Sequence, residues 1–324
     1  GYRAALRAAR SVLNPMTSLE IRHATLADVP GITAVHCSTV TVWRDPVTRA
    51  AVPYAQLDVF GRWRNGGPWM SVEMARVHVA SLLRAGQIIL VAVWGDEIVG
   101  EAEYYFTGEP GDYAALHLSI LYVHAAWQGR GIGRALLEAG VELARERGLR
   151  ALTTQPDAEA QGFYARQGFG VWRVQHELQL EADASRPLPQ LAPVTSAAAT
   201  PAPELALRIG RYQCGPQGWE VLWPALELPG WSDLRRAVWR GDLASGPAVL
   251  GLCEQLSDST QADAYVWLKP EAPLAPALTA LRALAAAQGF RAVDVLLAAA
   301  DLPAVRPHFR LEFQTRLDLW RRQL

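Results

Sequence analysis

Three glycines and two arginines fall within seven residues near the middle of the sequence, where residues 128–134 read Gln-Gly-Arg-Gly-Ile-Gly-Arg. Glycine lets successive backbone amides point into one concavity and lets the backbone approach a ligand closely. A predicted helix begins at these glycines, and its N-terminus adds partial positive charge to the full charges of Arg130 and Arg134. The segment therefore predicts an anion site that would fit a pyrophosphate.

Two familiar phosphate-binding turns do not match this spacing. A dinucleotide-binding turn reads G-x-G-x-x-G and usually opens the first βα unit, whereas the glycines here are Gly129, Gly131 and Gly133. A P-loop needs Gly-Lys-Ser/Thr after four intervening residues, and that sequence is absent.

The elements that would position this turn are a strand and a helix. Residues Leu116–Val123 read as a strand. From Ile132 to Arg147, apolar residues recur at helical spacing, and Gly148 follows as the residue that ends the helix. The anion site would therefore lie at a strand–turn–helix junction.

Further helices and strands alternate around this junction, and their order predicts an α/β fold, an α+β mixed sheet packed by helices. They are a helix that Thr25 or Asp28 caps, strands Ile88–Val93 and Ile98–Phe106 joined at Gly95-Asp96, a strand Ala151–Thr154, a helix Ala158–Gln167 ended by Gly168, and a strand Val171–Leu180.

The glycine-rich segment resembles the pyrophosphate motif of the GNAT superfamily of acyltransferases. Residues Gln128–Gly133 match its Q/R-x-x-G-x-G/A pattern in full, and Phe163-Tyr164-Ala-Arg-Gln-Gly-Phe169 looks like the family's helix-four signature. The resemblance runs from about Leu19 to Leu180. It implies the GNAT fold, in which two strands of a mixed sheet part and acetyl-CoA lies between them.

The resemblance also implies which residues hold acetyl-CoA, as a co-substrate and without a metal. Backbone groups of the strand would hold the pantetheine arm, and the turn would hold the pyrophosphate. Asp157 stands where the family often has asparagine, so a negative charge is added near the cofactor. The residues implied are Leu121, Tyr122, Val123, Gln128, Gly129, Arg130, Gly131, Ile132, Gly133, Arg134, Asp157 and Phe163.

In the family, an amine attacks the thioester directly, a base removes a proton from the ammonium, and an acid protonates the leaving thiolate. Tyr164 stands at the position of that acid; the alternative is that it only packs and hydrogen-bonds the cofactor's sulfur. His117 matches the base of serotonin-type enzymes, and the alternative is a structural histidine. Glu103, on the preceding strand, is the second candidate base and would act through water.

The segment Trp43–Val77 should shape the acceptor pocket, because the family varies most there. It holds Trp43, Phe60, Trp63 and Trp69, with Arg44, Arg62 and Arg64 between them. Aromatic rings interleaved with arginine suit an anionic or aromatic amine, and they equally suit a packed helical lid.

Composition narrows the class of protein. The chain has 324 residues, half of them hydrophobic, and a net charge of -1, so no overall field favours nucleic acid. No stretch is apolar enough to span a membrane. Cys37, Cys214 and Cys253 show no metal-ligand spacing and suggest a reducing compartment. We therefore expect a cytoplasmic protein with no metal site and no nucleic-acid or membrane partner.

A Pro- and Ala-rich linker, residues 184–203, divides the sequence. We expect an N-terminal extension at 1–15 upstream of Met16, a catalytic GNAT domain at 16–183, and a second, degenerate GNAT-like domain at 204–324. The segment Leu143–Leu152 aligns with Leu284–Val293 at an offset of 141. At the same offset the glycine-rich turn becomes Lys269–Leu274, where Pro270 and Pro273 remove backbone donors.

The second half is therefore expected not to bind CoA in the family manner, but to form an intramolecular pseudo-dimer with the first; a homo-oligomer stays open. The sequence as a whole predicts an acetyl-CoA-dependent N-acetyltransferase that acts on a primary amine. The competing hypothesis is a non-catalytic module that binds or senses acetyl-CoA and contacts a partner through its second half.

Overall fold

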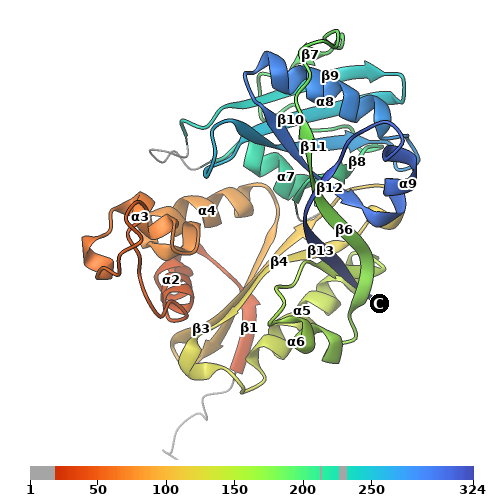
Figure 1. Ribbon diagram of the computed structural model, residues 1–324. Helices are drawn as coiled ribbons and strands as arrows, with labels where there is room; N and C mark the ends of the chain where they lie inside the picture. The colour runs from red at the N-terminus through yellow and green to blue at the C-terminus, as the bar shows by residue number, and fades with distance from the viewer. Residues whose placement is uncertain (1–18, 212–213, 226–231) are drawn as a thin grey trace, which may run out of the picture.

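The computed structural model describes residues 19–211, 214–225 and 232–324 of the chain. The expected N-terminal extension, residues 1–15, lies outside these ranges. The described residues form one continuous mixed sheet packed by helices, and the α/β class is confirmed (Figure 1). Within these residues, every helix is too short or too polar to cross a membrane.

The elements of the first half follow the predicted order closely. Its strands are β1 (Leu19–His23), β2 (Ile88–Trp94), β3 (Glu97–Phe106), β4 (Leu116–Val123), β5 (Ala151–Thr154) and β6 (Gly170–Glu181). Its α-helices are α2 (Val29–Cys37), α3 (Val59–Trp63), α4 (Val72–Arg84), α5 (Ile132–Glu146) and α6 (Gln161–Arg166).

The second half consists of similar elements. Its strands are β7 (Ala192–Pro193), β8 (Ala206–Ile209), β9 (Arg236–Leu243), β10 (Gly246–Glu254), β11 (Gln261–Leu268), β12 (Ala292–Ala298) and β13 (Glu312–Gln323). Its α-helices are α7 (Gly215–Leu222), α8 (Ala275–Ala287) and α9 (Leu302–Val305).

Local signals explain several of these boundaries. Thr25 accepts a hydrogen bond from the backbone N–H of Ala27, and the Asp28 carboxylate accepts one from Thr25, so the predicted cap is a capping box. Gly95 turns the chain between β2 and β3 at φ +64°. Gly148 ends α5 in the same left-handed region, at φ +66°.

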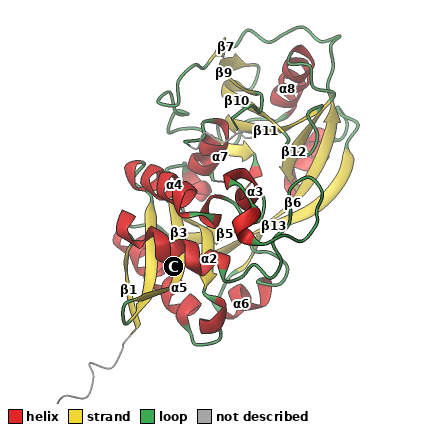
Figure 2. Cartoon of the chain, turned by 90° about the vertical axis from the view of Figure 1, so that its left-hand side faces the viewer, coloured by secondary structure: helices red, strands yellow, loops and turns green. Residues whose placement is uncertain are grey.

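The sheet of the first half is covered on both faces, because alternate residues of its strands enter different cores. Ile88, Leu90 and Ala92 on β2 pack in the cluster that contains α5. The intervening residues Ile89 and Val91 pack in the cluster that contains α2 and α4. β2 therefore presents one face to α5 and the opposite face to α4, and β3 contacts both α5 and α2; these helices are labelled in Figure 2.

The two halves exchange their last strands. β13, which ends the chain, pairs antiparallel with β5 of the first half, and β6 pairs antiparallel with β12 of the second half. β6 and β13 also pair with each other, so the sheet runs β5-β13-β6-β12 through the junction (Figure 1). The Pro-rich segment divides the sequence, but the sheet continues across the division.

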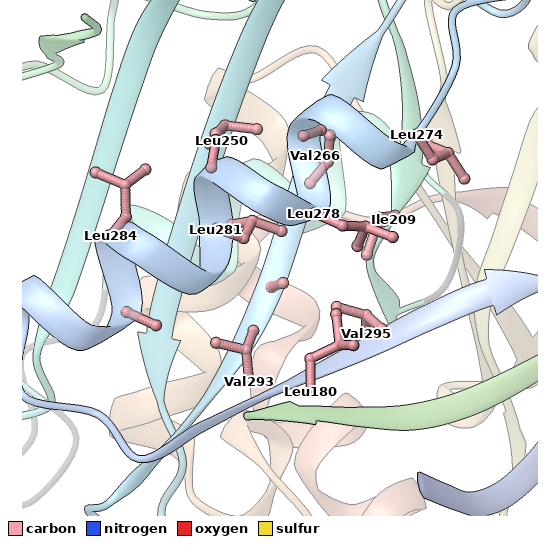
Figure 3. Packing of buried hydrophobic residues seen from close by; sticks show 14 of the residues in the cluster. Leu180, Ile209, Leu250, Val266, Leu274, Leu278, Leu281, Leu284, Val293 and Val295 are labelled. Atoms are coloured by element: carbon pink, nitrogen blue, oxygen red, sulfur yellow. The ribbon is translucent and has the colours of Figure 1, made fainter. Parts of the chain in front are cut away.

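The core of the second half contains a residue of the first. α8 packs Leu278, Leu281 and Leu284 against Leu250 of β10, and Leu180 of β6 lies in the same cluster (Figure 3). Since each half completes the other's sheet and core, we expect neither half to fold well alone.

The predicted linker lies along the second half rather than free of it. Its β7 pairs with β9. The carbonyl oxygen of Ala197 accepts a hydrogen bond from Trp219 Nε1 at 2.8 Å, and Leu191 packs on the core.

Candidate active site

The glycine-rich turn is open to solvent and has a left-handed backbone at two positions. Gly129 and Gly131 adopt φ +76° and +83°, and Gly131 is the residue that precedes the first turn of α5. A Cβ atom at either position would meet no atom within 4 Å, so the space above the turn is open. The Arg130 guanidinium lies over the Trp127 ring at 4.7 Å, and Gln128 Nε2 donates to the carbonyl of Val123 at 3.2 Å.

β4 and β5 separate beside this turn. Their pairing ends at Leu118 and Thr154, while β4 continues to Val123. Leu121, Tyr122 and Val123 are half-buried and pair with β3 on their other side. β4 and β5 thus part as the sequence resemblance implies, and the glycine-rich turn lies at the end of β4 that leads into α5.

Tyr164 lies where the two strands begin to part. It is 7% exposed on α6, and it hydrogen-bonds Thr154, the last paired residue of β5. Burial raises the pKa of Tyr164 to about 12, although the Thr154 hydrogen bond acts to lower it. The hydroxyl therefore keeps its proton at neutral pH.

Two further residues of the predicted cofactor set, Phe163 and Asp157, lie in or shortly before α6, the helix that contains Tyr164. The Phe163 ring lies 3.6 Å from the position of a Cβ on Gly133, so α6 contacts the start of α5. Asp157 is exposed, in a turn that precedes α6. α6 itself begins at Gln161, later than the predicted start at 158, because residues 157–160 form this turn.

A cavity of about 300 Å³ opens at the same point of the sheet, on the face that α4 covers. Ser119, the first residue of β4 beyond the pairing with β5, lines it. Its other lining residues come from both halves of the chain. They are Trp63, Gly67, Pro68, Trp69, His78, Ser81, Glu103 and Tyr105 of the first half and Gln217, Glu220, Val221, Pro224 and Ala225 of the second.

The segment Trp43–Val77 contributes to this cavity only in part. Trp63 and Trp69 line it, as the sequence suggests. The three arginines lie elsewhere: Arg44 is exposed and donates to a carbonyl, Arg62 stacks over Tyr54, and Arg64 lines a different hollow. The basic pocket that an anionic amine would need is thus not formed here.

Glu103 lines the cavity as one member of a buried ion pair. Its Oε1 accepts hydrogen bonds from Trp69 Nε1 at 2.8 Å and from His78 Nε2 at 2.9 Å. Burial acts to raise the pKa of Glu103, but the charge and hydrogen bond of His78 outweigh it and lower the pKa. The pKa of His78 is raised in turn by Glu103, against burial. The carboxylate is therefore ionised at neutral pH, and its charge favours the protonated form of the imidazole.

A second buried pair, which sequence reasoning did not identify, lies beside the first. His36 Nε2 is 2.5 Å from Glu101 Oε2, and both side chains are almost fully buried. Burial raises the pKa of Glu101 well above its usual value and lowers that of His36 to about 3. Each shift favours the neutral form of its group, and the two side chains share one hydrogen bond. The His36 ring also contacts Tyr122, with ring centres 4.4 Å apart.

His117 shares the face of Ser119 but is not among the residues that line the cavity. It is 1% exposed, and its Nδ1 lies 3.0 Å from the Thr153 hydroxyl. In the described part of the chain, its Nε2 has no hydrogen-bond partner. Burial lowers the pKa of His117 to about 3, so the ring is neutral at physiological pH.

This histidine predicts an acid-dependent loss of stability. Between pH 6.5 and about 3 the unfolded chain binds a proton at His117 and the folded chain does not, so stability falls as the pH falls. The free energy of unfolding should fall by about 1.4 kcal/mol per pH unit from this group. Urea unfolding from pH 7 to pH 4 should therefore show a shallower acid slope for His117→Gln than for the parent. Parallel slopes would contradict the assignment.

In the second half, the chain itself fills the place that corresponds to the parting of β4 and β5. β11 and β12 pair only over 261–263 and 292–294, so they part as β4 and β5 do. β8 then pairs with residues 266–268 of β11. The Arg208 guanidinium on β8 donates to the carbonyls of residues 269, 270 and 272 and to the Asp301 carboxylate. These interactions occupy the turn that replaces the glycine-rich segment.

Arg208→Ala should lower the free energy of unfolding by about 2 kcal/mol, because it leaves buried carbonyl oxygens and a carboxylate without their donor. Urea unfolding measures this. The matched control is Arg186→Ala, which breaks an exposed ion pair with Asp183 and should cost about 0.5 kcal/mol or less. Similar values for the two variants would show that Arg208 does not hold this turn.

A family model matches part of the first half of the chain, whereas similar solved structures extend over almost all of it. Residues 57–169 match the model of a family described as the acetyltransferase (GNAT) family. A GCN5-related N-acetyltransferase from Kribbella flavida is similar in structure, with a TM-score of 0.54 and 15% identity, over 96% of this chain and 72% of that one. One from Anabaena variabilis has a TM-score of 0.53 and 12% identity, over 94% and 72%. At these identities the likeness concerns the fold. No curated protein matches the sequence.

Proposed function

We propose that the first half of this chain, where residues 57–169 match the acetyltransferase (GNAT) family, transfers the acetyl group of acetyl-CoA to a primary amine. The observation that carries the proposal is the meeting of three features at one point of the sheet. The strands β4 and β5 part there, Tyr164 lies against Thr154 at the parting, and the cavity opens there at Ser119.

In this proposal, acetyl-CoA lies between the parted strands. The backbone of Leu121–Val123 holds the pantetheine arm, and the amides of Gly129–Arg134 hold the pyrophosphate. The open space above Gly129 and Gly131 and their left-handed conformation support this placement. Phe163, which contacts the start of α5, and Asp157 would lie beside the cofactor. The cofactor supplies an activated acetyl thioester.

The side chains then have separate tasks. The acceptor ammonium must lose a first proton before its nitrogen can attack. The nitrogen then bonds to the acetyl carbon and loses a second proton, the carbon–sulfur bond breaks, and the thiolate takes up one proton. Tyr164 is proposed to protonate the thiolate, since burial keeps its hydroxyl protonated. For the first proton, Glu103 is the stronger candidate of the two bases, because it lines the cavity as an ionised carboxylate and His117 does not line it.

The test is release of free thiol from acetyl-CoA in the presence of a panel of primary amines. Acetyl transfer to any of them, with one acetylated product per thiol, is the expected outcome. Tight acetyl-CoA binding without turnover across the panel would instead favour the non-catalytic binding module. Absence of binding would remove both functions and leave only the fold.

A further inference from the structure

The second half of the chain supplies part of the proposed acceptor cavity. α7 lies beside α4 at the junction of the two halves (Figures 1 and 2), and Gln217 and Glu220 on α7 line the cavity. Gln217 Nε2 donates to the Ser119 hydroxyl at 2.7 Å, which fixes α7 against the point where β4 and β5 part.

We propose that the acceptor is a small amine that carries no acidic group, and that Glu220 binds its positive charge. This inference rests on the proposed function, because it takes the cavity at Ser119 as the acceptor site. It assigns to the second half a direct part in substrate selection.

Glu220 is held in place for such a contact. Its Oε2 accepts a hydrogen bond from the Tyr105 hydroxyl at 2.9 Å. In the described part of the chain no donor reaches Oε1, so one carboxylate oxygen remains for a ligand. Burial raises the pKa of Glu220 to about 7, although Tyr105 and the charge of His78 act to lower it and Glu103 to raise it. A bound cation would stabilise the ionised form of this partly buried carboxylate.

The charges of the cavity wall separate amines from amino acids. Glu103 and Glu220 are the carboxylates of the wall and His78 is its basic residue, with no lysine or arginine among the described lining residues. The charge of His78 is already compensated by Glu103 at 2.9 Å. A substrate carboxylate would therefore be buried near Glu220 without a cationic partner, which is unfavourable.

The size and walls of the cavity limit the rest of the acceptor. A volume of about 300 Å³ is at the lower end of small-molecule sites. The indole rings of Trp63 and Trp69, together with Val221 and Pro224, give it apolar walls. Aromatic faces also attract ammonium groups. A compact amine with one ring or a short alkyl chain matches this combination.

The experiment compares three probes of one shape on the intact protein, by calorimetry or ligand-observed NMR at pH 8. They are 2-phenylethylamine, its neutral analogue 2-phenylethanol, and phenylalanine, which adds a carboxylate. We expect 2-phenylethylamine to bind about tenfold or more tightly than either of the others.

Glu220→Gln should remove this preference over the alcohol and leave binding of the alcohol itself unchanged. The matched control is Glu109→Gln, another buried carboxylate at the junction, which does not line this cavity and should keep the preference.

The pH dependence of binding distinguishes a direct contact between Glu220 and the amine from a purely structural role of Glu220. The titratable groups that interact with Glu220 are Tyr105 and Glu103 on β3, His78 on α4, and Cys214, which precedes α7. Protonation of Glu220 near pH 7 should weaken 2-phenylethylamine binding as the pH falls from 8 to 6, and Glu220→Gln should flatten that profile.

Equal binding of phenylalanine, an unchanged preference in Glu220→Gln, or no binding of 2-phenylethylamine overturns the inference. Because these measurements need no acetyl-CoA, selective binding without any turnover would instead count against the acetyltransferase.

Discussion

Gly131→Glu is expected to abolish acetyl-CoA binding, which in the parent chain should occur at one site. Gly131 precedes the first turn of α5 at φ +83°, and the first backbone amides of this helix have no side-chain cap. A glutamate there would place its own carboxylate against those amides and repel a pyrophosphate. Loss of two charge-assisted hydrogen bonds at about 1.5–3 kcal/mol each raises Kd at least about 100-fold. Calorimetry with acetyl-CoA measures both the affinity and the number of sites.

The control must share the backbone strain of this substitution, because a side chain at a left-handed position costs about 1–2 kcal/mol wherever it stands. Gly148→Glu meets that need. Gly148 lies at the other end of α5, has φ +66°, and also has no atom within 4 Å of an added Cβ. It should bind acetyl-CoA like the parent. Equal loss in both variants would attribute the effect to folding, and two sites in the parent would mean that the second half binds the cofactor too.

Tyr164→Phe should lower kcat by about 100-fold or more while acetyl-CoA affinity changes little, since a positioned general acid contributes about 10²–10⁴ in rate. Burial keeps the pKa of Tyr164 at about 12, so in the parent this group should impose no fall in kcat between pH 6 and 10. Thiol release, measured with the best amine of the panel across that range, gives both kcat and its pH profile.

Tyr104→Phe provides the matched control for this measurement. Tyr104 is fully buried in the same core, and its hydroxyl donates to the carbonyl of Leu136 at 2.9 Å. Its loss should cost about 1 kcal/mol of stability and leave kcat near the parent value. A Tyr164→Phe enzyme as fast as Tyr104→Phe would reduce Tyr164 to a packing residue, which is the alternative that the sequence left open.

Local physics made the elements around the site predictable from sequence. β4 and β5 begin and end at the predicted residues, because alternation of apolar residues and the turn residues around them act over a few positions. The same holds for α5, which starts at the glycines and ends before Gly148. Since the glycine-rich turn is part of one strand–turn–helix unit, its placement required no long-range information.

Only some of the residues that line the cavity could be predicted from local sequence. Glu103 was identified by its strand, but its partner His78 comes from α4, and nothing in the spacing of the two residues joins them. Glu220 gave no signal at all, because a single glutamate on a short helix reads as a solvated surface residue. It became part of the cavity only when α7 was placed against α4 and β4.

The sequence by itself determined the glycine-rich strand–turn–helix unit and the order of strands and helices in the first half, because each depends on interactions between near neighbours in the chain. Only the tertiary structure decided that β6 and β13 change places between the halves, that β8 and Arg208 fill the corresponding place in the second half, and that Glu220 reaches the first half's cavity. These outcomes depend on which edges and faces lie uncovered once the sheets have formed. Several partners of similar hydrophobicity satisfy the same local pattern, so shape and pairing register in the folded molecule select among them.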